Sequence, residues 1–261
     1  MARGKEVDLA TASAALDGQW ALLRSWVAAL PWSEYALPSV LDGWTVGDLV
    51  GHVSRTLLLF ETLEPASGVV TPLSIGGYVS AYAGVADEIR ERAIDTAAEI
   101  AADPLAALDA TWATRRPLIA ALQPSEVMAA MRGPIRSGDL VATRVIECVV
   151  HADDLSQSVP DRESVGLDTG ALALVVRALL AILAERHPGN AVEVRVPPFG
   201  VVQCIDGPRH TRGTPPNVVE TSALTWVRLA AGRLAWAEAV HAGDVRASGE
   251  RADLTTHLPL L

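Results

Sequence analysis

The sequence from residue 139 to residue 157 reads DLVATRVIECVVHADDLSQ. It follows a segment broken by glycine and proline that ends at Gly138, and its apolar residues predict one helix. Glu147 and His151 are four residues apart, so their side chains lie one turn apart on the same face of that helix. The residues around them are valine, isoleucine and cysteine. A carboxylate on so apolar a helix needs a partner, because a lone buried charge is costly.

A divalent metal would satisfy both side chains at once, and a third ligand would then come from another element. His52 is the best candidate, because it lies in the middle of an apolar helix predicted from Thr45 to Leu63. Two imidazoles and one carboxylate leave open coordination positions, which is typical of catalytic zinc and of some iron sites. The alternative is that each histidine is a hydrogen-bonded core residue, and helical spacing by itself does not choose between the two.

Helical periodicity extends over most of the first 187 residues. Thr45 and Asp48 have the spacing of a capping box at the start of the helix that carries His52. Asp103 and Pro104 predict another helix start, because proline is favoured at the first helical position. The predicted helices cover residues 7–30, 45–63, 78–101, 104–122, 139–157 and 168–187, and residues 124–138 are predicted to form a loop.

The residue pattern changes after Pro188. Val192, Val194 and Val196 alternate with charged residues, which predicts a strand. Further strands are expected at residues 201–205, 218–221 and 245–248, with short helices at 224–229, 236–241 and 251–258. We therefore predict an all-α domain at residues 1–187 and a small α+β domain at residues 188–261.

The composition restricts the classes of partner. The formal net charge is −10, and an acidic chain is repelled by nucleic acid phosphates and by anionic membranes, so we expect neither as a partner. The sequence has 2 cysteines, Cys148 and Cys204, which are too few for a disulfide scaffold and favour a reducing cytoplasm. Cys148 points about 100° away from Glu147 around the helix, so we predict a core residue there.

Two segments carry a resemblance to a known family. LPSVLDGWTVGDLVGHV, residues 37–53, resembles the opening motif of the mycothiol-dependent maleylpyruvate isomerase family. ECVVHADDL, residues 147–155, resembles its second motif, in which Glu-x-x-x-His is followed by an acidic residue and leucine. The resemblance covers the first 187 residues and implies a DinB-like four-helix bundle with His52, Glu147 and His151 as metal ligands. Spacing and resemblance select the same three residues, and zinc is the expected metal.

The end of the chain carries a second resemblance. AGRLAWAEAVHAGDVRASGERADL, residues 231–254, is similar to the end of sterol carrier protein domains, which are small α+β folds with an apolar cavity. Maleylpyruvate isomerases themselves have a C-terminal domain of related fold. The predicted fold class is therefore α+β, with an N-terminal DinB-like four-helix bundle followed by a small sterol-carrier-like domain.

Three arginines are candidate catalytic residues that would bind a substrate carboxylate. Arg55 and Arg144 each lie three residues from a candidate metal ligand and are predicted to face the metal cavity, and Arg233 is predicted to reach toward the cavity between the domains. The alternative for each is an ordinary arginine in a salt bridge or in solvent. Asp48 and Asp154 lie a turn from the histidines and could orient the imidazoles, although Asp48 is equally well explained as a cap.

The resemblance implies an enzyme in which mycothiol, a low-molecular-weight thiol of actinobacteria, is a cosubstrate. The thiol would bind as a thiolate at an open metal position and add to an electrophilic carbon. Re-elimination after bond rotation gives isomerisation, and addition without re-elimination gives thiol transfer. The rival hypothesis is a non-catalytic metal-containing protein whose C-terminal domain binds an apolar or lipid ligand. We expect small-molecule partners, a cytoplasmic location, and a monomer or weak dimer.

Overall fold

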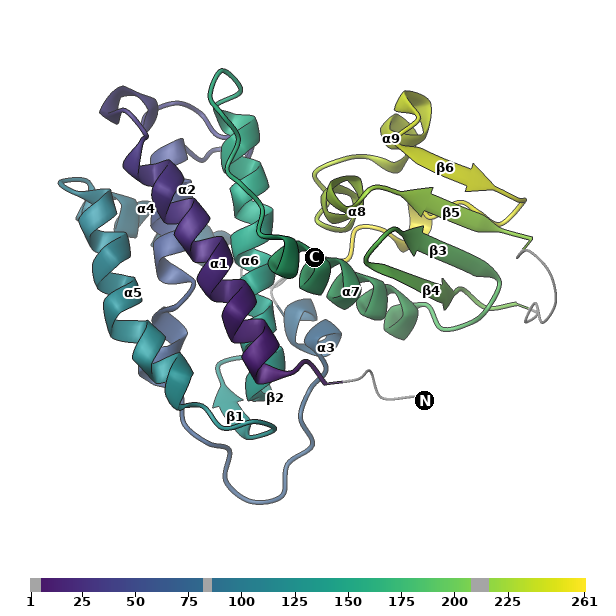
Figure 1. Cartoon of the computed structure of the whole chain (residues 1–261), viewed down its shortest axis with the longest axis horizontal. Helices are drawn as coiled ribbons and strands as arrows, with labels where there is room; N and C mark the ends of the chain where they lie inside the picture. The colour runs from purple at the N-terminus through teal and green to yellow at the C-terminus, as the bar shows by residue number, and fades with distance from the viewer. Residues whose placement is uncertain (1–5, 82–85, 208–215) are drawn as a thin grey trace. The chain divides into compact units, whose positions relative to one another are not determined.

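The computed structural model describes residues 6–81, 86–207 and 216–261 (Figure 1). These residues divide into two compact units, Glu6–Ala171 and Leu172–Leu261, which we call the bundle unit and the sheet unit. Among the described residues, no helix combines the length and the apolar character that crossing a bilayer requires.

The bundle unit is a four-helix bundle with additional short elements. Helix α1 packs against α5 and α6, and α2 packs against the same two helices, so the four enclose an apolar core. Helix α4 packs along α2. The bounds are α1 (Leu9–Ala28), α2 (Val46–Arg55), α3 (Ile75–Ser80), α4 (Ala86–Ile100), α5 (Pro104–Ala121) and α6 (Ser137–Ser158).

The helix starts follow from local hydrogen bonding. The side chain of Thr45 accepts a hydrogen bond from the Asp48 amide, and the Asp48 carboxylate accepts one from the Thr45 amide, which is the predicted capping box of α2. Asp103 accepts a hydrogen bond from the Ala106 amide, and Pro104 occupies the first turn of α5 as expected. These caps fix where each helix begins and therefore which side chains face the core.

Three predictions for the bundle unit differ from the structure. The helix predicted from residue 45 ends at Arg55 and is followed by a 3₁₀-helix, η2 (Leu58–Glu61). The helix predicted over residues 78–101 corresponds to α3 and α4, and residues 82–85 between them lie outside the described part of the chain. The predicted loop 124–138 contains an antiparallel hairpin of β1 (Val127–Ala130) and β2 (Gly133–Arg136). Gly133 and Pro134, which in the sequence indicate a break in regular structure, are themselves the first two residues of β2.

The sheet unit is built on a four-stranded mixed sheet. The strand order is β4-β3-β5-β6, with β3 antiparallel to β4 and parallel to β5, and β5 antiparallel to β6. The strands are β3 (Val192–Val196), β4 (Gly200–Cys204), β5 (Val218–Thr221) and β6 (Val245–Ser248). The helices are α7 (Thr169–Arg186), α8 (Ala223–Ala230) and α9 (Trp236–Ala242). Only a 3₁₀-helix, η3 (Thr255–His257), forms in the predicted last helix.

One face of this sheet belongs to a closed core. Val192, Val194 and Val196 are fully buried, as their alternation with charged residues predicts. Helix α7 contributes to the same unit: a Cβ at Gly200 of β4 would come within 2.9 Å of the Leu180 side chain. The guanidinium of Arg177 on α7 donates a hydrogen bond to the Phe199 carbonyl (2.9 Å).

The position of α7 bears on the boundary between the two units. The change of residue pattern in the sequence predicts a boundary at 187/188, after α7. The contacts of the chain group most of α7 with the sheet, and the division falls at 171/172. The periodicity of α7 is helical whichever unit it packs in, so periodicity does not assign it to one of them.

Two truncated chains distinguish these boundaries. We expect a fragment that begins at residue 168 to unfold cooperatively on heating, because it keeps α7 and its contact with β4. A fragment that begins at residue 188 should lose the apolar surface that α7 buries in this unit, and with it the thermal transition. Circular dichroism melting curves of both fragments test this expectation. Equal cooperativity in the two would favour the boundary at 187/188.

A close approach of α2 and α4 gives a second prediction. A Cβ at Gly51 would lie 2.8 Å from the Ala97 amide nitrogen and 2.9 Å from the Ala93 carbonyl oxygen. Both are backbone atoms, so the helices would have to separate. We expect Gly51→Ala to lower the free energy of unfolding by about 1–3 kcal/mol, measured by urea denaturation.

Gly77 in α3 is the matched control for this substitution. A Cβ there would meet nothing closer than 3.4 Å. Because alanine is the better helix former, Gly77→Ala should leave stability unchanged or raise it by up to about 1 kcal/mol. If both substitutions have the same effect, helix propensity and not the α2–α4 approach explains Gly51.

Candidate metal centre

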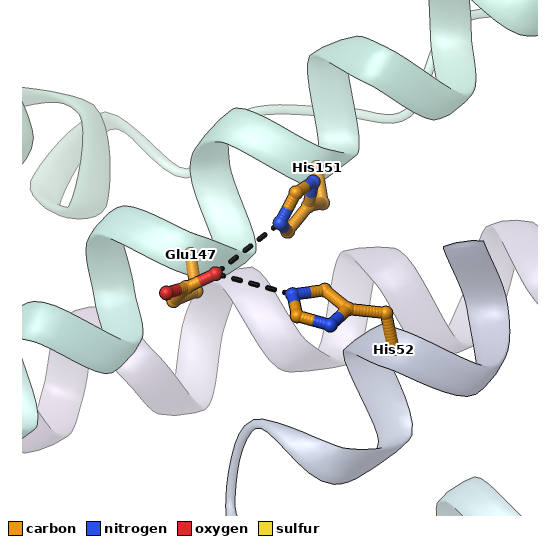
Figure 2. Close-up of side chains that lie close together, drawn as sticks. All are labelled: His52, Glu147 and His151. Carbon is orange, nitrogen blue, oxygen red and sulfur yellow. Dashed lines mark hydrogen bonds and ion pairs between the residues drawn. The ribbon is translucent and has the colours of Figure 1, made fainter. Parts of the chain in front are cut away.

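Helices α2 and α6 bring three candidate ligands together. His52 projects from α2, and Glu147 and His151 project from successive turns of α6 (Figure 2). The Nε2 atom of His52 lies 3.4 Å from Glu147 Oε2, and the Nε2 atom of His151 lies 3.2 Å from the same oxygen. One ligand atom from each residue falls within 4.8 Å of the others, and this is the one such cluster found among the described residues.

These separations fit a bound divalent metal. Zinc binds histidine nitrogen and carboxylate oxygen at about 2.1 Å, so neighbouring ligands of a tetrahedral site lie about 3.4 Å apart. The two printed distances in the cluster are close to that value. The donor set of two imidazoles and one carboxylate is the one expected from the sequence. The donor set and these two separations are therefore compatible with a metal held by three protein ligands.

The ring of His151 is held in the orientation that a ligand needs. Its Nδ1 atom lies 2.9 Å from Oδ2 of Asp154, and that carboxylate is fully buried. A carboxylate on one ring nitrogen leaves the other, Nε2, directed at the metal position, and raises its basicity as a ligand. The Asp154 contact with His151 is the one that an orienting residue would make, and its role at a metal centre stays a prediction.

Asp48 does not share that role. Its Oδ2 atom accepts hydrogen bonds from the amide (2.8 Å) and the hydroxyl (2.7 Å) of Thr45, so its carboxylate belongs to the cap of α2. The sequence left both explanations open for Asp48. The structure selects the cap, because the carboxylate reaches back toward the helix start.

The charge state of the cluster follows from its contacts. Burial raises the pKa of Glu147, but its hydrogen bonds with His151 and His52 and the charge of Arg144 outweigh burial and hold that pKa well below its usual value. Burial lowers the pKa of His151, but its contacts with Asp154 and Glu147 outweigh burial and raise that pKa to about 9. For His52 burial dominates, and the pKa is lowered. Glu147 is therefore an anion in the centre of the cluster.

Of the three arginines predicted to be catalytic, Arg144 lies against the cluster. A terminal nitrogen of its guanidinium is 4.0 Å from Glu147 Oε1, and its other terminal nitrogen donates to the Thr56 carbonyl (3.4 Å). Thr56 is the C-cap of α2, so the buried guanidinium also stabilises the negative end of that helix. Arg144 thus links α6 to α2 beside the ligands.

The other two arginines have different partners. Arg55 donates a hydrogen bond to the Thr96 hydroxyl (2.8 Å) on α4. Arg233 lies in the sheet unit, where it donates to the Ala231 carbonyl (3.0 Å). Arg55 is therefore held by α4 and not by the cluster, and the role of Arg233 stays a prediction.

The sequence-based prediction missed one residue of the site. Trp44 is partly exposed, and its ring stands nearly perpendicular to that of His52, with centroids 5.5 Å apart. No helical spacing links a loop residue to a helix, so periodicity carried no signal for this contact. Cys148 is buried as predicted, and burial raises the pKa of its thiol to about 12.

Asp154 and Asp48 form a natural pair for testing the site. We expect Asp154→Asn to weaken zinc binding by about 10–100-fold, because an amide is a weaker partner for His151 Nδ1 than a carboxylate. Asp48→Asn should leave zinc affinity unchanged, since its carboxylate serves the cap. Competition with a chromophoric chelator measures both affinities. Equal losses in the two variants would show that neither aspartate orients a ligand.

The chain is similar to known proteins in both of its units. The family model described as the mycothiol maleylpyruvate isomerase N-terminal domain matches residues 16–156, and the model described as a bacterial SCP ortholog matches residues 168–260. No curated protein gives a significant match to the chain.

Two solved structures share its fold. They are the mycothiol-dependent maleylpyruvate isomerase and a histidine-to-alanine mutant of that enzyme, with TM-scores of 0.54 and 0.53. Each is 17% identical in sequence, and the match covers 92% of this chain and 92% of the other. The N-terminal family model spans more than half of the chain, so the chain belongs to the mycothiol maleylpyruvate isomerase N-terminal domain family, followed by a bacterial SCP domain.

Proposed function

We propose that this protein is a metal-dependent enzyme that uses mycothiol as a cosubstrate and acts on a small electrophilic substrate, as an isomerase or a thiol transferase. The observation that carries the proposal is the cluster of His52, Glu147 and His151, which offers three protein ligands with metal-like spacing. The family to which the chain belongs supports mycothiol as the thiol. We propose zinc as the metal because of the nitrogen and oxygen donor set.

The residues of the cluster define what the chain itself contributes. A divalent metal bound there supplies a Lewis acid that lowers the pKa of a coordinating thiol and keeps it ionised at neutral pH. Glu147 provides the negative charge that holds a cation, and Asp154 holds His151 in its ligand orientation. The side chains of His52 and Glu147 keep 15% and 20% of their surface exposed, so part of the cluster is open to solvent.

Arg144 is the best-placed residue for a substrate carboxylate. Its guanidinium is buried next to Glu147 and is fixed by hydrogen bonds to Thr56 and Thr143. A fixed guanidinium orients an anion at little entropic cost. Arg55 would have to leave Thr96 to take the same role, so we place it second, and Arg233 remains a candidate from the sheet unit.

The rival function, binding of an apolar ligand by the C-terminal domain, has less support. Five large side chains in the core of the sheet unit have no accessible surface: Val192, Val194, Leu179, Val219 and Trp226 are all 0% exposed. A cavity large enough for even one water would leave some surface on the residues that line it. Packed side chains therefore fill the space around these residues.

We extend the proposal to the cellular location and the oligomeric state of the protein. Two buried free cysteines, Cys148 and Cys204, suit a reducing cytoplasm, where low-molecular-weight thiols are kept reduced. A monomer or weak dimer is sufficient, because the three ligands come from one chain.

Calorimetry with mycothiol tests the proposed function. The zinc-loaded protein should bind the thiol at least about tenfold more tightly than the metal-free protein, because the metal stabilises the ionised form. Binding should also release a proton, which titrations in two buffers of different ionisation enthalpy measure directly. Equal affinities for the two forms would exclude a metal-held thiol.

Matched histidine variants separate the metal from the thiol in this experiment. His52→Ala and His151→Ala should lose zinc by elemental analysis and lose thiol binding with it. His241→Ala, which changes an exposed histidine of the sheet unit, should keep both. A His52→Ala protein with full zinc content would show that the metal lies elsewhere.

A further inference from the structure

The two candidate histidine ligands are supported in different ways. His151 has the Asp154 carboxylate on its second ring nitrogen, at 2.9 Å. Among the described residues, the hydrogen-bonding contact of the His52 ring is with Glu147, through Nε2, the nitrogen that faces the metal position. The nearest carboxylate in sequence, that of Asp48, is taken by the cap of α2. Metal-binding histidines usually have a partner that fixes the ring, so His52 needs another one.

The indole of Trp44 packs against the ring of His52. Its ring centroid lies 5.5 Å from that of His52, and the two ring planes meet at 83°. This edge-to-face geometry is a favoured arrangement of aromatic pairs. A perpendicular indole resists rotation of the imidazole about its Cβ–Cγ bond, because rotation would lose the contact or cause a clash.

The loop that carries Trp44 is anchored to the helices of the bundle unit. Within the loop, the Trp44 amide donates a hydrogen bond to the Leu41 carbonyl (3.0 Å), and the Trp44 carbonyl accepts one from the Ser39 amide (2.8 Å). The neighbouring Val40 amide donates to the hydroxyl of Ser158 at the end of α6 (3.0 Å). Because α6 carries Glu147 and His151, the loop is tied to the helix that holds the other two ligands.

A second anchor comes from α4. Arg90 donates a hydrogen bond to the carbonyl of Gly43 (3.1 Å), the residue before Trp44. Gly43 has a φ of +72°, in the left-handed region that glycine adopts without strain. The glycine sets the direction in which the chain enters Trp44. Hydrogen bonds to α6 and to α4 thus anchor the loop that places the indole against His52.

We propose that Trp44 is a positioning residue for the metal centre, which fixes the ring of His52 through an aromatic contact in place of the hydrogen bond that Asp154 makes to His151. The inference rests on the proposed metal site. It assigns a role to a residue that binds no metal itself. It also accounts for the difference between His151, whose Nδ1 atom contacts the Asp154 carboxylate, and His52, whose Nδ1 atom has no such contact among the described residues.

Cobalt substitution tests this proposal with a spectroscopic readout. The d–d absorption of Co²⁺ reports the coordination geometry, so it changes when a ligand ring is no longer fixed. Trp44→Leu keeps an apolar side chain and removes the aromatic ring; we expect a changed spectrum and about tenfold weaker Co²⁺ binding. Trp44→Phe keeps a ring and should restore both toward the parent values.

Trp32→Leu is the matched control. Trp32 is 63% exposed and contacts Tyr35, away from the cluster, so its loss should leave the Co²⁺ spectrum unchanged. Thermal unfolding of the metal-free proteins should be similar for the two leucine variants, which excludes a general loss of folding as the cause.

Proton NMR of the zinc-loaded protein examines His52 directly. In the parent protein the indole should shift the ring-proton resonances of His52 through its ring current, and Trp44→Leu should remove that shift. An unchanged Co²⁺ spectrum and affinity in Trp44→Leu would overturn the role of Trp44. Absence of Co²⁺ binding by the parent protein would instead overturn the metal site.

Discussion

The carboxylate of Glu147 is an anion on a helix whose other residues are almost all buried, and the arrangement of the bundle unit follows from the need to stabilise it. An isolated buried carboxylate would be protonated or would destabilise the fold. Here two imidazoles and the guanidinium of Arg144 surround it and keep it ionised. The same contacts join α6 to α2. The side chains proposed to hold the metal therefore also stabilise the packing of these two helices.

The residues around the cluster have separate structural roles. Two aspartates of similar placement in the sequence do different things: Asp48 caps α2 and so sets the phase of His52 on that helix, whereas Asp154 holds the ring of His151. Trp44 approaches His52 from a loop that is anchored on α4 and α6. The side chains of the cluster are held by contacts from α6, from α2 and from the loop that carries Trp44.

The sheet unit follows a different physical principle. Its alternating valines are buried completely, and the side chains of α7 and α8 that share this core have little or no accessible surface. Burial of apolar surface stabilises this unit without any buried charge cluster of the kind seen in the bundle unit, as far as the described residues extend. The metal-dependent chemistry that we propose lies in the bundle unit, and the SCP-like fold by itself does not imply a bound lipid.

The sequence by itself determined the local features: the helices of the bundle, the pairing of Glu147 with His151 one turn apart, the cap at Thr45 and the alternation of β3. Each depends on residues within a few positions of one another, which periodicity and capping rules describe. Only the tertiary structure decided that Arg144 and not Arg55 lies at the cluster, that Trp44 contacts His52, and that α7 packs with the sheet. His52 and Glu147 are separated by 95 positions along the chain. Contacts over such distances depend on how helices pack in space, and helical periodicity identifies a buried face without identifying what lies against it.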